Sequence, residues 1–251
     1  MQIEYRKEYS NHLGRDMEYK VYGHRGKPVL AFPTSFGRFW QWEDLGMIGS
    51  VEWFINNGDI QVWTVDGLDA ETTKSDSWDM MGRIRRYDAY MGYIRDELLP
   101  NVLNWSRWAN DGFEHKAMVT GASMGAFHAA NFFFHQPWQL DSLVAMSGAY
   151  STDSLFGNYK PDEVAAYSPL NYLQGTFVDD RWLAYQRCKI VLACGQGDWE
   201  EPMLTETKLL GDLLRRRDIP VWEDLWGHDQ HHDWPLWRAQ FPYFLSKLLW
   251  S

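Results

Sequence analysis

The sequence predicts an α/β protein with a mostly parallel central sheet, an antiparallel N-terminal hairpin and helices on both faces. Short apolar runs, such as residues 28–32 and 189–194, alternate along the chain with longer segments of helical periodicity. Two alternating runs joined by a polar turn through Asn11 and Gly14 precede them. Alternation of strands and helices is typical of a parallel sheet covered on both faces.

The first half of the chain supplies the hairpin and the first parallel strands. Strands are expected at residues 3–9, 17–22, 28–32, 60–65 and 116–120. Helices are expected at residues 47–56 and 83–105. The first of these helices ends at Asn57-Gly58, and the second repeats apolar side chains at helical spacing.

The second half continues the alternation. Further strands are expected at residues 143–146, 189–194 and 221–225. Helices are expected at residues 124–135, 203–216 and from the last strand toward Leu249. Residues 150–186 form the longest part without a strand, which is interpreted as a small lid or a plain connection. Because no repeat or linker interrupts the pattern, residues 1–251 are expected to form a single domain.

The amino-acid composition argues against several classes of binding partner. The formal charge is −10, from 34 acidic and 24 basic residues, which argues against a nucleic-acid or anionic membrane surface. No apolar run approaches the roughly 20 residues of a membrane span, and no signal peptide is visible. Cys188 and Cys194 lie in one expected strand, about 20 Å apart, too far for a disulfide. A cytoplasmic protein with reduced thiols is therefore expected.

The strongest motif is Gly121-Ala122-Ser123-Met124-Gly125, between an expected strand and an expected helix. In a nucleophile elbow the serine occupies a strained strand-to-helix turn, so the residues two positions away on each side must be small. The amide of Met124 opens the helix, where a developing oxyanion is stabilised. The pattern predicts Ser123 as a nucleophile and the Met124 amide as an oxyanion donor.

A serine nucleophile needs a base and an acid, which follow it in the order acid, then histidine. The strand ending at Cys194 leads into a glycine-rich turn with Asp198, the predicted acid, and Glu200, the alternative. The last strand leads into a loop with His228, His231 and His232, any of which stands where the base belongs.

The second oxyanion donor should come from the loop after residues 28–32. The amide of Ser35 is predicted, with Thr34 and Phe36 as alternatives, because Pro33 has no N–H to donate.

His228 and His232 are four residues apart, a spacing that also occurs in metal sites. That spacing aligns two ligands only on a helix, and Gly227 and Pro235 indicate a loop. No metal and no cofactor are therefore expected.

These motifs resemble the esterase branch of the α/β-hydrolase superfamily, which includes esterase D (S-formylglutathione hydrolase), feruloyl esterases and the antigen 85 mycolyltransferases. The resemblance covers nearly the whole chain in element order, and it is most specific at the elbow, at Gly195 to Asp198 and at His232 to Trp237. It implies the α/β-hydrolase fold, an acyl-enzyme on Ser123 and His232 as the base. The loop at residues 32–35 lacks the His-Gly start of esterase D, so that substrate is not implied.

Three functions compete at this point. The predicted one is a carboxylic-ester hydrolase in which Ser123 attacks, His232 moves the proton and Asp198 orients the imidazole. The alternatives are an acyltransferase with the same residues and a non-catalytic binding module. A small-molecule ester, an acylated sugar among the candidates, fits the acidic and aromatic composition. Trp40, Trp78 and Trp199 are interpreted as pocket-lining or packing residues on loops at strand ends.

Overall fold

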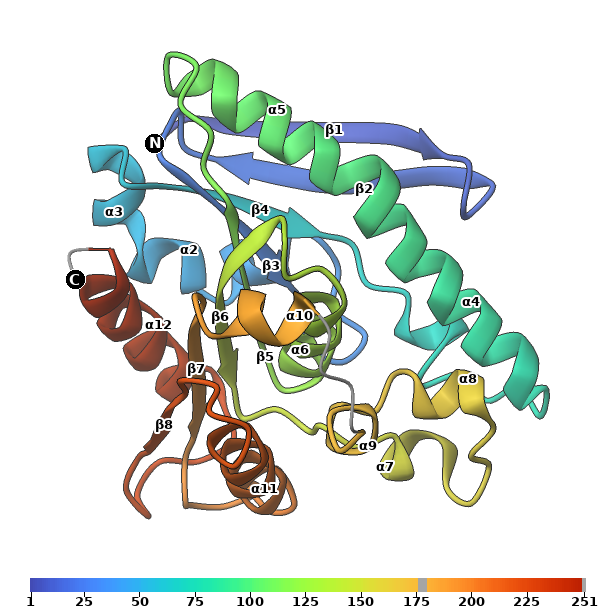
Figure 1. Ribbon diagram of the computed structural model, residues 1–251. Coiled ribbons are helices and arrows are strands. Elements are labelled where there is room, and N and C mark those ends of the chain that lie inside the picture. The colour runs from blue at the N-terminus through green and yellow to red at the C-terminus, as the bar shows by residue number, and fades with distance from the viewer. Residues whose placement is uncertain (176–179, 250–251) are drawn as a thin grey trace.

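The computed structural model describes residues 1–175 and 180–249, and its strands form one eight-stranded sheet (Figure 1). The strand order is β1-β2-β4-β3-β5-β6-β7-β8. The strands are β1 Ile3–Ser10, β2 Arg15–Tyr22, β3 Lys27–Phe32, β4 Ile60–Val65, β5 Ala117–Ala122, β6 Leu140–Met146, β7 Lys189–Cys194 and β8 Trp222–Leu225. Strand β2 pairs antiparallel with β1 and β4, and all other pairs are parallel. The predicted fold class is confirmed.

Helices cover both faces of the sheet, because the strand side chains alternate between two apolar layers. In β3, Leu30 and Phe32 join one layer, whereas Val29 and Ala31 join the other. The first layer is covered by α4 Met80–Tyr93, α5 Leu99–Ala109, α6 Met124–His135 and α11 Met203–Arg215. The second is covered by α1 Gln41–Asp44, α2 Met47–Ser50, α3 Glu52–Asn57 and α12 Trp234–Leu248.

Two of the expected helices are interrupted. The helix expected at residues 47–56 is divided into α2 and α3 at Val51. The helix expected at residues 83–105 begins earlier and contains a π-helical turn, η2 Ile94–Leu98, between α4 and α5. Pro100 lies in the first turn of α5 and has no N–H to donate to the preceding turn, which accounts for the wider winding there.

The stretch between β6 and β7 contains short helices on the α4–α6 side of the sheet. They are α7 Asp153–Phe156, α8 Asp162–Ala165, α9 Pro169–Tyr172 and α10 Asp180–Tyr185. Residues 176–179 of the stretch expected to lack strands lie outside the described residues, and the described remainder has none. Phe156, Val164 and Tyr185 are buried in the same core as α6, so this connection packs on the body of the protein.

The parallel strands place their carboxyl ends along one edge of the sheet, where the loops after β3 to β8 meet. Both cysteines are buried free thiols, but they do not share a strand as expected, because β7 begins at Lys189, directly after Cys188. Within residues 1–175 and 180–249, no helix has the length and apolar character that crossing a membrane requires.

Candidate active site

Ser123 lies in a tight turn between β5 and α6, with φ 55° and ψ −122°. A Cβ atom at Gly121 would lie 2.2 Å from the backbone of Gly125, and one at Gly125 would lie 2.5 Å from the Phe32 carbonyl oxygen. Only glycine fits at either position, which is the steric reason for the motif. Met124 is the first residue of α6, so its amide has no acceptor within the helix.

His232 reaches Ser123 from the loop between β8 and α12. Its Nε2 lies 2.9 Å from Ser123 Oγ, and its ring meets Trp237 edge to face at a centroid distance of 5.0 Å. The other two candidates point elsewhere: the ring of His228 contacts the loop after β7, and His231 is exposed on the same surface. The structure therefore brings His232, of the three histidines, to Ser123.

The carboxylate beside His232 is Glu200, not the predicted Asp198. Glu200 Oε2 lies 3.0 Å from His232 Nδ1, and the Glu200 side chain is 1% exposed. The Asp198 side chain is 82% exposed and lies 3.6 Å from the ring of His231. The structure therefore brings Glu200, the alternative, to His232, and it leaves the predicted Asp198 at the surface.

Backbone geometry between β7 and α11 explains this arrangement. A Cβ atom at Gly195 would lie 2.4 Å from the Gln230 carbonyl oxygen. Glycine therefore allows the loop after β7, which carries the acids, to contact the loop after β8, which carries the histidines. Trp199 then adopts a left-handed conformation, with φ 67°, between Asp198 and Glu200. The reversal leaves Asp198 at the surface and buries Glu200. Sequence spacing contains no signal for this change of direction.

Glu200 is surrounded by donors that the sequence did not indicate. Its Oε1 accepts hydrogen bonds from Ser147 Oγ at 2.8 Å and from the Gly195 amide at 3.1 Å, and Oε2 accepts one from Cys194 Sγ at 3.3 Å. The indole N–H of Trp237 donates to Ser147 Oγ at 3.0 Å, which leaves the hydroxyl proton of Ser147 for Glu200. The position of Ser147 directly after β6 is the one sequence feature that could have suggested it.

These contacts favour the ionised form of Glu200 and hold the ring of His232 against it. Burial by itself raises the pKa of Glu200, but hydrogen bonds from His232 and Ser147 more than offset it and lower the pKa below its usual value. A carboxylate can only accept, so the proton of the neutral imidazole lies on Nδ1 of His232. Nε2 is then free to accept the hydroxyl proton of Ser123.

In the loop after β3, the three amides predicted or weighed as oxyanion donors differ in their partners. The amide of Thr34 donates to the Gln41 side chain at 2.9 Å, and that of Phe36 donates to the Asp69 carboxylate at 3.0 Å. Among the described residues, the Ser35 amide has no acceptor. The two alternatives are thus occupied, and Ser35 is the donor that remains for a ligand.

Several aromatic side chains on the loops that follow β3, β4 and β7 are exposed. Trp199 is 83% exposed and Trp78 is 95% exposed, while Trp40 is partly covered by the Arg38 guanidinium, 4.7 Å from its ring. Phe36, next to Ser35, is 62% exposed. Packing in the core therefore does not account for these rings.

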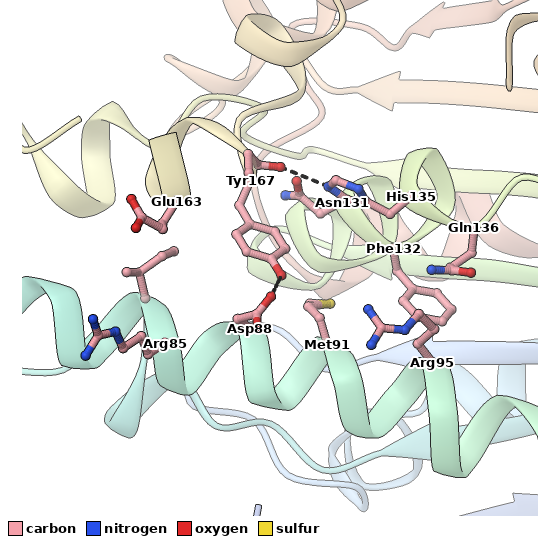
Figure 2. A pocket seen from close by; sticks show the side chains of 12 residues that line it. Arg85, Asp88, Met91, Arg95, Asn131, Phe132, His135, Gln136, Glu163 and Tyr167 are labelled. Atoms are coloured by element: carbon pink, nitrogen blue, oxygen red, sulfur yellow. Dashed lines mark hydrogen bonds between the residues drawn. The ribbon is translucent and has the colours of Figure 1, made fainter. Parts of the chain in front are cut away.

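A hollow of about 430 Å³ lies between α4, α8 and the last turn of α6 (Figure 2). One of its lining residues is His135, the last residue of α6. Ser123 precedes the first residue of this helix, so the hollow and Ser123 are separated by the length of α6, about 18 Å. Two of its polar side chains are paired within the wall: the Tyr167 hydroxyl donates to Asp88 at 2.5 Å, and His135 contacts the Ala166 carbonyl oxygen at 2.9 Å. This hollow is separate from the chemistry at Ser123.

His228 and His232 do not face a common ligand, because the ring of His228 contacts the Gln196 carbonyl oxygen and that of His232 contacts Ser123. In the part of the chain that the structure describes, no three His, Cys, Asp or Glu side chains are grouped to hold a metal ion.

Residues 10–248 match the model of a protein family described as "Putative esterase". The chain belongs to this family. The resemblance inferred from the elbow and the histidine segment is confirmed, and the protein is a carboxylic-ester hydrolase of the serine-hydrolase class. No curated protein sequence matches this esterase.

Solved structures show the same fold at low sequence identity. A ferulic acid esterase is 16% identical with a TM-score of 0.72, covering 99% of this chain and 96% of its own. MPT51 of Mycobacterium tuberculosis is 13% identical with a TM-score of 0.72, covering 99% and 98%. S-formylglutathione hydrolase of Staphylococcus aureus is 15% identical with a TM-score of 0.64, covering 99% and 97%. This esterase therefore has the α/β-hydrolase fold.

Proposed function

We propose that the esterase cleaves a small-molecule carboxylic ester through an acyl-enzyme on Ser123, with His232 as base and Glu200 as acid. The observation that carries the proposal is a chain of two hydrogen bonds. Ser123 Oγ and His232 Nε2 are 2.9 Å apart, and His232 Nδ1 and Glu200 Oε2 are 3.0 Å apart. Nucleophile, base and orienting carboxylate in this order are the working parts of a serine hydrolase.

In the first half-reaction, Ser123 Oγ attacks the ester carbonyl carbon while His232 Nε2 takes the hydroxyl proton. The imidazolium that forms is stabilised by the ionised Glu200. The carbonyl oxygen becomes an oxyanion, and the amides of Met124 and Ser35 donate hydrogen bonds to it. Collapse of the tetrahedral intermediate breaks the bond to the alcohol, which leaves with the proton from His232.

In the second half-reaction, water attacks the acyl carbon and gives its proton to His232. The second tetrahedral intermediate then releases the carboxylic acid, and Ser123 recovers its proton. His232 can act in both directions because Nδ1 keeps its proton and donates it in a hydrogen bond to Glu200 throughout, while Nε2 takes and returns the moving proton.

For the substrate, we propose an ester with a ring close to the scissile bond, an acylated sugar or an aromatic acyl group. Phe36 and Trp199 support this, because they are exposed directly beside Ser35 and Glu200 in sequence. Exposed aromatic faces bind flat or ring-shaped groups. The similar ferulic acid esterase carries such an acyl group in its name. Screening p-nitrophenyl esters of increasing acyl length beside acetylated sugars and aryl esters measures the preference.

The central test is Ser123→Ala, assayed with p-nitrophenyl acetate. We expect turnover to fall to the uncatalysed background, and mass spectrometry of the wild type treated with a fluorophosphonate to find the label on Ser123. Full activity of a folded Ser123→Ala protein would remove the proposal.

The oxyanion assignment has its own matched pair. Ser35→Pro removes the amide hydrogen and is expected to lower kcat by about 10²- to 10³-fold. Ser35→Ala keeps the amide and should stay within about 3-fold of the wild type. Equal activity of the two variants would move the donor to another residue.

A further inference from the structure

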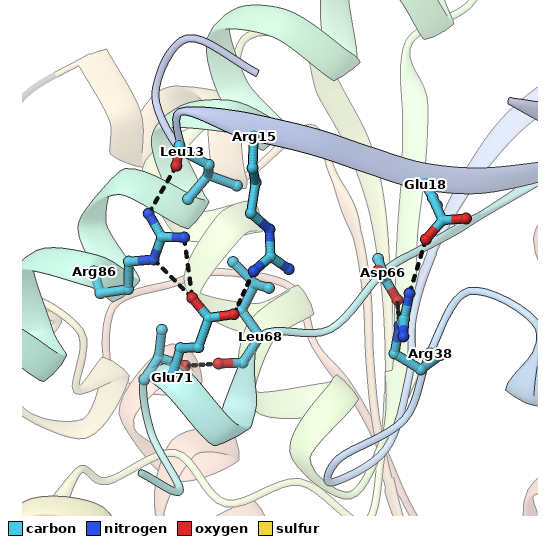
Figure 3. Close-up of polar contacts among 9 residues, drawn as sticks. Leu13, Arg15, Glu18, Arg38, Asp66, Leu68, Glu71 and Arg86 are labelled. Carbon is cyan, nitrogen blue, oxygen red and sulfur yellow. Dashed lines mark hydrogen bonds and ion pairs between the residues drawn. The ribbon is translucent and has the colours of Figure 1, made fainter. Parts of the chain in front are cut away.

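The loop that carries Ser35 is held by carboxylates that follow β4. Asp69 accepts the Phe36 amide at 3.0 Å, and Asp66 accepts the Phe39 amide at 3.3 Å. Asp66 also accepts a hydrogen bond from the Arg38 guanidinium, which donates a second one to Glu18 of β2 at 2.9 Å (Figure 3). The loop is therefore held at residues 36, 38 and 39, directly after Ser35, by side chains from outside it.

Asp69 is the more deeply engaged of these carboxylates. Its side chain is 2% exposed, and its second oxygen accepts hydrogen bonds from His128 Nε2 and Thr73 Oγ1, each at 3.0 Å. Burial by itself raises the pKa of Asp69, but the adjacent His128 and the Phe36 amide offset this and lower it below its usual value. A buried carboxylate with three donors is an ionised, well-ordered anchor.

His128 connects this anchor to the nucleophile helix. It lies in α6, four residues after Met124, and its side chain is 2% exposed. The Nδ1 atom is 2.9 Å from the hydroxyl of Tyr87, which is itself fully buried on α4. The pair of His128 and Asp69 thus joins the helix that begins at Met124 to the neighbour of Ser35.

The segment that carries Asp69 is itself fixed. It belongs to η1 Asp69–Glu71, and Glu71 binds Arg15 of β2 and Arg86 of α4, the latter at 3.0 Å (Figure 3). Arg86 also donates to the Leu13 carbonyl oxygen at 3.0 Å. Movement of the anchor away from α6 would therefore break contacts with the hairpin as well.

We propose that Asp69 and His128 are positioning residues that hold the two oxyanion-binding amides, of Ser35 and Met124, at a fixed separation. The inference rests on the function proposed above. Burying a carboxylate and a histidine costs desolvation free energy. If these two positions served packing alone, two apolar side chains could fill them without that cost. Its connection of the two donor segments gives it a role in catalysis, since an oxyanion is stabilised only by donors already in place.

The test compares Asp69→Ala with Asn110→Ala. Asn110 is a matched control because it is also buried and binds the backbone at Gly26, at the other end of β3. Loss of the anchor should lower kcat for p-nitrophenyl acetate by about 10- to 100-fold, with KM within about 3-fold. The control should keep its kcat within about 2-fold at a comparable loss of thermal stability.

A trifluoromethyl ketone gives a readout that a structural role alone would not move. Ser123 Oγ adds to its carbonyl carbon, His232 takes the proton, and the carbonyl oxygen becomes the oxyanion. In Asp69→Ala the inhibition constant should rise by the same factor by which kcat/KM falls. His128→Phe, which keeps a ring in the core, should show the same parallel change with a smaller factor, and it replaces Asp69→Ala if that variant fails to fold.

The inference is overturned if folded Asp69→Ala or His128→Phe has a kcat within about 2-fold of the wild type. It is also overturned if the inhibition constant does not change, or if Asn110→Ala loses kcat equally. Failure of the proposed function is a separate result, because it would appear as an active Ser123→Ala protein.

Discussion

Two carboxylate–histidine pairs lie side by side in the loops after β7 and β8. Glu200 and His232 are 1% and 15% exposed and 3.0 Å apart. Asp198 and His231 are 82% and 52% exposed and 3.6 Å apart. The same residue types, within two positions of each other on each loop, thus form one buried pair and one surface pair.

The difference shows that composition alone does not make a catalytic pair. Water and salt screen the exposed pair, and its side chains are not held in one geometry. The buried pair interacts across a medium of lower polarisability, and Glu200 has further donors that order it. Only such a pair can keep the imidazole in one tautomer facing Ser123.

The largest expected difference between the pairs is at the histidines. His232→Ala should lower kcat/KM for p-nitrophenyl acetate by about 10⁴- to 10⁶-fold, because Ser123 loses its base. His231→Ala should change it by less than about 3-fold. An active His232→Ala protein beside an inactive His231→Ala protein would reverse the assignment.

The carboxylates should follow with a smaller effect. Glu200→Gln keeps the shape of the side chain but removes its charge, and we expect a loss of about 10⁴-fold in kcat. Asp198→Asn is the matched change on the surface and should leave kcat within about 2-fold. If Asp198→Asn were the inactive one, the assignment of Glu200 as the acid would be wrong.

The hydrogen bonds that hold Glu200 in place can be weakened while the contact between Glu200 and His232 is kept. Ser147→Ala deletes one donor to Glu200, a hydrogen bond to a charged group, and should lower kcat by about 10-fold. The same change should move the pKa of Glu200 upward, since that hydrogen bond favours the ionised form. A kcat equal to that of the wild type would show that the remaining donors suffice.

The smallest expected effect is on how the free energy of unfolding depends on pH. Because the folded-state pKa of Glu200 is lowered, its contribution to the free energy of unfolding is complete above the unfolded-state pKa and is lost as pH falls through the folded-state pKa. Urea unfolding of the wild type and Glu200→Gln should therefore differ less at pH 3 than at pH 7. Asp198→Asn is the control, and a constant difference for Glu200→Gln would contradict the expectation.

Much of this molecule could be predicted because its signals are local. The order of strands and helices followed from periodicity, and α6 begins and ends where it was expected. Interruptions such as η2 were missed, because the apolar repeat runs through Pro100 without a break. The short helices between β6 and β7 were missed because each is little more than one turn.

The sequence by itself determined the elbow, since the clash of a side chain at Gly121 with Gly125 is built into five consecutive residues; the clash at Gly125 is with Phe32, at the end of β3. The tertiary structure alone decided which acid meets His232 and which side chains surround it. The choice of Glu200 depends on a backbone reversal at Trp199, and the contact of Asp69 with His128 joins residues 59 positions apart. Such partners are selected by where distant elements pack and by the burial that packing creates, and neither is encoded in local spacing.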